Sequence, residues 1–358
     1  MSEVVLGMPG RRSGTPEPRP DDSRLIDRFG RVATDLRVSL TDRCTLRCSY
    51  CMPPEGLDWM PDERVLTDDE LIRLIRLAVE RLGVDEVRFT GGEPLLRRGL
   101  ERIVAATSAL RTASGGRPAT ALTTNGIGLA HRAQALADAG LDRVNVSLDT
   151  LDPERFARLT HRDRHHDVLA GLTAAARAGL GPVKVNTVLM RGVNDDEAVA
   201  LVHWAVTHGY ELRFIEQMPL DPHGAWNRAD MVTAAEILEQ LSASLSLTPV
   251  TGRGASPAEV WRVADAAEGA VGRVGIVASV TRPFCGDCDR ARLTADGQVR
   301  DCLFARHETD LRGALRSGAD DEALAELWRG AMWAKRAGHG IDDPSFLQPD
   351  RPMSAIGG

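Results

Sequence analysis

Alternating strand-like and helix-like patterns run along most of the chain. Residues 36–40 alternate apolar and polar positions with the period of two that is typical of a strand. In residues 71–82 the apolar positions recur at three- and four-residue spacing, as on one face of a helix. Thr67 and Glu70 form a capping-box pattern before this helix, and Gly83 follows it as a stop signal. The pattern therefore predicts a strand followed by a helix with defined ends.

The same strand–helix unit is repeated further along the chain. Asp152 followed by Pro153 predicts one more helix start, because Asp caps a helix and Pro fits its first turn. Repeated units of this kind imply parallel strands joined by right-handed crossovers, and six units predict an α/β fold with a partial (βα)6 TIM-type barrel. Further strands are predicted at 86–90, 119–124, 143–148, 182–190 and 211–216, and further helices at 99–112, 131–139, 167–179 and 196–208.

The pattern changes after residue 229. A helix is predicted at 232–247, strands near 259–264 and 272–280, a hairpin turn at Asp296-Gly297, and helices near 308–317 and 320–335. We expect residues 230–358 to form a C-terminal region that closes the open barrel of residues 25–229. Residues 1–24, rich in Pro, Gly, Arg and Asp, predict a disordered leader.

Composition excludes several classes of protein. Of the 358 residues, 43% are apolar and 27% charged, which is typical of a folded globular chain. The net charge of −7 and the aromatic content of 4% argue against a nucleic-acid partner. No apolar run approaches the ~20 residues that a membrane span needs, and no secretory signal is visible. We therefore expect a cytoplasmic protein with no membrane partner.

The six cysteines form two groups, the first triplet (Cys44, Cys48 and Cys51) and the second triplet (Cys285, Cys288 and Cys302). Disulfides are disfavoured, because nothing marks secretion. Zinc prefers four tetrahedral ligands, whereas each triplet offers three thiols, and His161, His165 and His166 are better explained by a solvated loop. Three thiolates on a 4Fe–4S cluster leave one iron open to a small molecule. The pattern thus favours two clusters, while a zinc-stapled, non-enzymatic binding protein stays open as an alternative.

The spacing Cys44-x3-Cys48-x2-Cys51, with Tyr50 before the last cysteine, resembles the signature of radical S-adenosylmethionine (SAM) enzymes. Three further features point to one family among these enzymes: the second triplet, the neighbouring Arg290 and Arg292, and the final Gly-Gly. Together they resemble the GTP 3′,8-cyclase family, which carries out the first step of molybdenum cofactor biosynthesis. The resemblance runs from about residue 29 to the last residue. It implies a lyase that uses two 4Fe–4S clusters and SAM.

The resemblance also implies roles for individual residues. It makes all six cysteines cluster ligands, and it places Gly357 and Gly358 as a tail in the active site. Guanidinium groups that converge in one barrel suit a triphosphate, because they form charge-assisted and often bidentate hydrogen bonds. The implied SAM-binding residues are Tyr50, Gly92, Ser147 and Met218, and the implied GTP-binding residues are Arg37, Arg88, Thr123, Lys184, Arg290 and Arg292.

Four other charged residues are weaker candidates. Arg97 and Arg98 could join the GTP site, although we expect them to be exposed. Glu93 and Asp149 are the best-placed carboxylates, but neither is predicted to be a general base, because radical chemistry does not need a paired acid and base at its first step.

The implied reaction converts GTP to (8S)-3′,8-cyclo-7,8-dihydroguanosine 5′-triphosphate. A radical formed from SAM would take hydrogen from C3′ of the ribose, and the ribose radical would attack C8 of guanine. Expected partners are GTP, an unidentified electron donor, and cyclic pyranopterin monophosphate synthase as the next pathway enzyme, with the chain a monomer or homodimer. The nearest alternative is another radical SAM enzyme with an auxiliary cluster that acts on a peptide.

Overall fold

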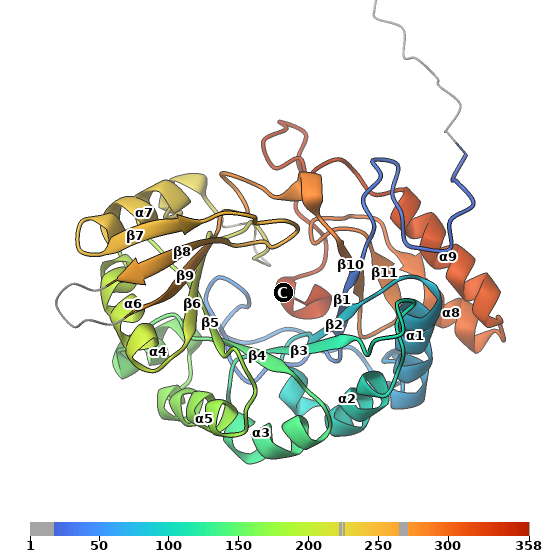
Figure 1. Cartoon of the computed structure of the whole chain (residues 1–358), viewed down its shortest axis with the longest axis horizontal. Helices are drawn as coiled ribbons and strands as arrows, with labels where there is room; N and C mark the ends of the chain where they lie inside the picture. Colours follow the sequence, from blue (N-terminus) through green and yellow to red (C-terminus); the bar gives the residue numbers. More distant parts are fainter. Residues whose placement is uncertain (1–17, 222–223, 225, 265–270, 358) are drawn as a thin grey trace, which may run out of the picture.

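The computed structural model describes residues 18–221, 224, 226–264 and 271–357 (Figure 1). Within them one sheet of 12 strands has the order β12-β11-β10-β1-β2-β3-β4-β5-β6-β9-β8-β7. The six strands predicted for the barrel are confirmed to within two residues, and each is parallel to its neighbour. These strands are β1 (Asp35–Ser39), β2 (Glu86–Thr90), β3 (Ala119–Thr124), β4 (Arg143–Ser147), β5 (Lys184–Val188) and β6 (Glu211–Ile215).

Helices cover the outer face of this curved sheet (Figure 1). Local hydrogen bonds fix their ends as the sequence predicts. The Glu70 backbone N–H donates to the Thr67 hydroxyl at 3.2 Å, and the Thr67 N–H donates to the Glu70 carboxylate at 2.7 Å. Asp152 caps its helix by accepting two backbone N–H groups. The helices are α1 (Asp68–Arg81), α2 (Leu100–Ser108), α3 (Leu129–Asp138), α4 (Pro153–Thr160), α5 (His165–Arg177) and α6 (Ala198–Thr207).

Alternation along each barrel strand separates the hydrophobic core from the barrel interior. In β1, Leu36 and Val38 have no exposed surface, and both belong to the main hydrophobic core. Arg37, between them, points to the opposite face, because successive side chains of a strand alternate. Apolar side chains therefore stabilise the barrel from outside, and its inner face is left for polar chemistry.

The region after residue 229 extends both edges of the sheet. β9 (Val271–Val277) is parallel to β6, and β10 (Arg290–Leu293) is parallel to β1. β9 and β10 are not hydrogen-bonded to each other, so the barrel is open, and the loop 278–289 joins its two edges. The other elements are α7 (Ala234–Ser242), β7 (Ser246–Val250), β8 (Glu259–Ala264), β11 (Gln298–Arg300), β12 (Thr309–Asp310), α8 (Leu311–Arg316), α9 (Asp321–Trp333), α10 (Met353–Ile356) and the short 3-10 helices η1 (Asp62–Arg64), η2 (Pro94–Leu96), η3 (Asp195–Glu197), η4 (Arg228–Asp230) and η5 (Cys285–Asp287).

Three predicted elements end markedly earlier than expected: the helix predicted at 99–112 ends at Ser108, the strand predicted near 272–280 ends at Val277, and the third is a helix of the carboxyl-terminal region. The helix expected at 232–247 stops at Ser242, and Ser246 begins β7. β7 pairs along its whole length with β8, from Ser246 opposite Ala264 to Val250 opposite Val260. This long-range pairing overrides the local helical periodicity. The Asp296-Gly297 hairpin is confirmed, because β10 and β11 pair antiparallel around it.

Residues 18–24, the described part of the predicted leader, lie against α9. The Arg19 guanidinium forms an ion pair with Glu326 at 2.5 Å. The boundaries of the leader and of the two larger regions stay predictions. No helix in the described ranges is both long and apolar enough to cross a membrane.

Candidate active site

The first triplet lies in the loop that follows β1. Backbone hydrogen bonds from Arg47 and Ser49 to the end of α4, at 2.9 and 3.0 Å, anchor this loop. The Asn125 side chain donates to the Cys44 sulfur at 3.7 Å. Burial raises the pKa of all three thiols, that of Cys51 to about 12. As free thiols they would stay protonated, so binding a cluster there must displace three protons.

Tyr50 is held in place by Asp149, at the end of β4. The Tyr50 hydroxyl donates to one carboxylate oxygen at 2.9 Å, and the Val188 backbone N–H donates to the other at 2.9 Å. Burial raises the pKa of Asp149 to about 6. This carboxylate orients an aromatic side chain that lies between two thiols of the triplet in sequence.

Gly92 is a glycine because two loops touch there. A Cβ atom at this position would lie 2.3 Å from the carbonyl oxygen of Arg43 and 2.5 Å from that of Asp42. The loop after β2 therefore packs directly on the loop of the first triplet. The next residue, Glu93, accepts hydrogen bonds from Leu95, Thr124 and Asn125, and burial raises its pKa to about 7.

The other two predicted SAM residues lie at the same end of the barrel. Ser147 is the last residue of β4, next to Asn186 of β5. Met218 follows β6 and packs on a small cluster formed by Leu220, Phe304 and Ile356. The four predicted SAM residues therefore come from loops or strand ends on the carboxyl side of β1, β2, β4 and β6, where the first triplet also lies.

Three of the predicted GTP residues form a row across adjacent strands. Arg37 of β1 is the register partner of Arg292 in β10 and of Arg88 in β2. Neighbouring strands are about 4.8 Å apart, so three guanidinium groups are brought together on the inner face. Burial lowers the pKa of Arg37 well below its usual value and that of Arg292 to about 10. The buried Nε atoms of Arg37, Arg88 and Arg290 have no hydrogen-bond partner among the described residues.

The predicted GTP-binding residues lie at different levels of their strands. Arg37 and Arg88 are the middle residues of β1 and β2, and Lys184 and Arg290 are the first residues of β5 and β10. A parallel register brings equivalent positions of neighbouring strands together at every level of a barrel. The basic residues therefore lie nearer the amino ends of the strands than the first triplet, which lies beyond their carboxyl ends. Thr123 lies in β3 and accepts a hydrogen bond from the Asn145 amide at 3.3 Å.

Two predicted candidates lie elsewhere. Arg97 forms an ion pair with Asp68 at 2.6 Å and also donates to the Leu66 carbonyl, so it fastens a loop. Arg98 is exposed, as expected. His165 is not in a solvated loop, because α5 begins there and buries the ring against Phe156.

Arg213 is an interior cation that the sequence reasoning missed. It lies in the middle of β6, beside Asn186 of β5. Burial and the charges of Arg88 and Arg143 lower its pKa to about 10. The alternation of residues in this strand could have identified it. Arg213 lies between the apolar Leu212 and Phe214, so its side chain faces the barrel interior.

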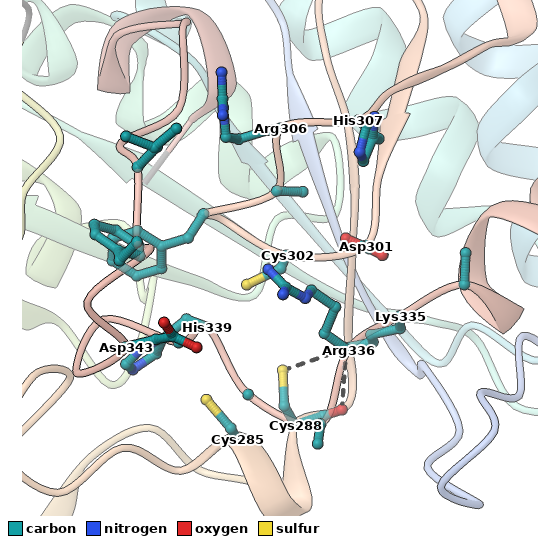
Figure 2. A pocket seen from close by; sticks show the side chains of 18 of the residues that line it. Cys285, Cys288, Asp301, Cys302, Arg306, His307, Lys335, Arg336, His339 and Asp343 are labelled. Atoms are coloured by element: carbon teal, nitrogen blue, oxygen red, sulfur yellow. Dashed lines mark hydrogen bonds between the residues drawn. The ribbon is translucent and has the colours of Figure 1, made fainter. Parts of the chain in front are cut away.

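The second triplet lines a cavity of about 780 Å³ (Figure 2). Cys285 and Cys288 come from the loop between β9 and β10, and Cys302 follows β11. Burial raises the pKa of Cys285, and that of Cys302 to about 11. Three thiols that line one cavity are a donor set that suits an iron–sulfur cluster. Among the described residues, no three His, Cys, Asp or Glu side chains are grouped as ligands of a single metal ion.

α10 connects the two triplets. Its Ser354 backbone hydrogen-bonds the Cys51 thiol, and its Ile356 belongs to the cluster on which Cys302 packs. Gly357 follows, buried among the barrel strands, and the red carboxyl-terminal segment lies in the middle of the ring of strands (Figure 1). Gly358 lies outside the described residues. The two triplets are thus joined through the interior of the protein.

Comparisons with known proteins agree with this arrangement. Residues 38–205 match the radical SAM superfamily, and residues 210–341 match the Molybdenum Cofactor Synthesis C family. A GTP 3′,8-cyclase of Streptomyces coelicolor is 65% identical over 93% of this chain and 96% of its own length. One from Mycolicibacterium smegmatis is 56% identical over the full length of both chains. SuiB of Streptococcus suis, solved with bound S-adenosylmethionine, has a TM-score of 0.54 at 14% identity, covering 83% of this chain and 68% of its own. That likeness shows the fold alone.

Proposed function

This chain belongs to the GTP 3′,8-cyclase family of radical SAM enzymes, and on that premise we propose that it cyclises GTP inside the barrel, between the two cysteine triplets. It is an enzyme of the first step of molybdenum cofactor biosynthesis. Its product would be (8S)-3′,8-cyclo-7,8-dihydroguanosine 5′-triphosphate. The family comparisons support the reaction, and the arrangement of interior side chains supports the location.

The cysteines would hold two clusters. The first triplet would bind the 4Fe–4S cluster that carries SAM, and the second triplet would bind another 4Fe–4S cluster at the 780 Å³ cavity. When bound, these groups supply the one-electron chemistry that removes hydrogen from the ribose. Tyr50, Gly92, Ser147 and Met218 would surround SAM at the carboxyl ends of the strands.

The chain's own residues would bind and neutralise the triphosphate. In the row formed by Arg37, Arg88 and Arg292, Arg88 pairs with Glu86 at 2.7 Å and Arg37 lies 3.9 Å from Asp35. Among the described residues, no carboxylate lies within ion-pair distance of Arg292, so this row can accept further negative charge. Planar guanidinium groups bind phosphate oxygens bidentately, and they do so more strongly where water is excluded. Arg213, Lys184, Arg290 and Thr123 would complete this site.

The tail would keep bulk water from the reacting atoms. α10 and Gly357 fill the interior next to the first triplet, and Ile356 closes the apolar contact with Phe304. A carbon radical attacks any nearby C–H bond, so a site that produces one must be closely lined.

The single observation that carries the location is the register of three arginines across β10, β1 and β2. A peptide substrate would not need this buried positive charge, whereas a triphosphate would. We further propose that GTP is the substrate, that an external electron donor serves the first cluster, and that the product passes to the next enzyme of the pathway, with the chain acting as a monomer or homodimer.

The test is anaerobic turnover by the reconstituted protein with GTP, SAM and reductant. We expect one cyclised nucleotide for each 5′-deoxyadenosine and about eight irons per chain, as two 4Fe–4S clusters require. Formation of 5′-deoxyadenosine without a cyclised nucleotide would favour the alternative that the protein is a radical SAM enzyme acting on a peptide. Two zinc ions and no iron would refute the proposal.

A further inference from the structure

Lys335 is a buried ammonium beside the second triplet. It lies just after α9, and only 3% of its surface is exposed. Lysine is almost never fully buried unless an anion or several acceptors compensate its charge. Among the described residues no carboxylate lies within ion-pair distance of its Nζ atom.

Its three protons have three acceptors. Nζ donates to the carbonyl oxygen and the sulfur of Cys288, at 3.2 and 3.4 Å (Figure 2). It also donates to the carbonyl oxygen of Arg290 at 2.9 Å. An ammonium has three donors, so this set is complete. The two carbonyls fix the position of Nζ, and the third proton is directed at the sulfur. The Arg290 guanidinium approaches the same sulfur at 3.9 Å.

The two triplets therefore differ in charge. At the second triplet two cations, Lys335 and Arg290, direct hydrogen bonds at the Cys288 sulfur, at 3.4 and 3.9 Å. At the first triplet the side-chain donor to the Cys44 sulfur is the neutral Asn125 amide, with the Arg47 cation and the Glu93 and Asp149 carboxylates nearby. One carboxylate, Asp301, lines the cavity of the second triplet. Positive charge and hydrogen bonds at the ligand sulfurs stabilise the reduced state of an iron–sulfur cluster.

We propose that Lys335 is a positioning residue for the second cluster: its ammonium donates a charge-assisted hydrogen bond to the Cys288 ligand and holds that cluster at a more positive reduction potential than it would have without this charge. The inference rests on the proposed function, since it needs a cluster at the second triplet. It extends that function by assigning the two clusters different electronic environments.

The test isolates the second cluster in the full-length chain by replacing Cys44, Cys48 and Cys51 with Ala. In this parent, the midpoint of one-electron reduction is measured by an EPR-monitored titration under anaerobic conditions. Lys335→Met removes the charge and keeps the length of the side chain, and Lys335→Arg keeps the charge. Arg336→Met is the matched control, because Arg336 lines the same cavity and is exposed.

We expect Lys335→Met to shift the midpoint to more negative potential by at least a tenfold change in the reduction equilibrium, which is about 59 mV for one electron. Lys335→Arg should shift it less, and Arg336→Met hardly at all. If Lys335→Met loses iron while Lys335→Arg retains it, the charged hydrogen bond is needed to hold the ligand, which also supports the proposal.

An unchanged midpoint in Lys335→Met, or an equal shift in Arg336→Met, would overturn it. Loss of iron from both Lys335 variants would assign the residue a packing role and would overturn it as well. A parent that binds no iron would instead refute the second cluster, and with it that part of the proposed function.

Discussion

The guanidinium of Arg292 donates a hydrogen bond to the carbonyl oxygen of Gly357. Arg292 is also a member of the arginine row to which we assign the triphosphate. The carboxyl-terminal segment and the substrate therefore share one guanidinium group, so a change in the tail should be felt in turnover even though the tail carries no reactive side chain.

Gly357→Ala should displace the tail. Gly357 has a φ of 76°, and a Cβ atom there would lie 2.5 Å from the Ser39 hydroxyl oxygen and 2.7 Å from a Thr90 methyl carbon. The positive φ alone costs a non-glycine residue about 1–3 kcal/mol. We expect turnover of GTP to fall about tenfold or more, with the iron content unchanged.

The control is Gly209→Ala, since Gly209 has a φ of 72° and nothing within 4 Å of the added Cβ atom. It isolates backbone strain from contact inside the barrel. Equal turnover by both variants would show that the position of Gly357 does not matter for catalysis.

Arg351→Ala should release the segment that leads into α10. Arg351 makes two hydrogen bonds of 2.9 Å to the Asp296 carboxylate, which is 1% exposed. Because Arg351 is partly exposed, we expect a loss of about 2–3 kcal/mol, between the values for surface and buried pairs. Thermal unfolding and the rate of proteolysis near residue 351 measure it. Arg306→Ala, which breaks an exposed pair with Asp350, should change neither, and the proposed anchor would be refuted by an equal effect of the two variants.

Asp149→Asn should change how stability depends on pH. The pKa of Asp149 is raised from 3.8 to about 6 by burial. The folded chain thus binds this proton more tightly than the unfolded chain, so the stabilising contribution is present below pH 3.8 and is lost as the pH rises through 6. The two-unit shift corresponds to roughly 3 kcal/mol.

Asparagine stays neutral and can still bond Tyr50 and Val188. Relative to the parent, Asp149→Asn should therefore gain stability between about pH 4 and pH 7 in urea unfolding of the iron-free chain. Tyr50→Phe keeps the carboxylate and removes a hydrogen bond that lowers its pKa, so the loss of stability with rising pH should persist and become larger. A parallel pH profile for Asp149→Asn and the parent would contradict the assignment.

Arg213→Ala should weaken GTP binding. A lost charge-assisted hydrogen bond to phosphate is worth about 1.5–3 kcal/mol, or roughly ten- to a hundredfold in Kd. Equilibrium binding of GTP to the iron-loaded protein without SAM measures the change. Arg262→Ala, at an exposed position of β8, is the control and should bind GTP like the parent. Equal affinity of Arg213→Ala and the parent would remove Arg213 from the site.

Much of the barrel could be predicted from the sequence, because its signals are local. The Thr67–Glu70 capping box and the alternation around Arg37 depend only on neighbours in the chain. The end of the helix before β7 could not be predicted in this way, since β8, which pairs with β7, follows it in the chain and competes with the helix.

The candidate site likewise has features that local sequence predicts and features that depend on long-range contacts. The six cysteines and the aromatic Tyr50 stand out by spacing. The level at which Arg37, Arg88 and Arg292 meet depends on strand register, and the partners of Lys335 depend on a loop that returns from α9 to the second triplet. Neither the arginine register nor the contacts of Lys335 can be predicted from the residues next to them in the sequence.

The pairing of β1 with β10 has a consequence for how the protein is made. Asp35 pairs with Glu86 on one side, and its partner on the other side is Arg290; Leu212 of β6 pairs with Val185 on one side and with Val274 on the other. During synthesis, which proceeds from the amino terminus, the outer edges of β1 and β6 therefore stay unpaired until the last third of the chain emerges. Such exposed edges invite association with other chains, so folding should depend on chaperones and slow assembly, and truncation before residue 290 should yield aggregates instead of a smaller barrel.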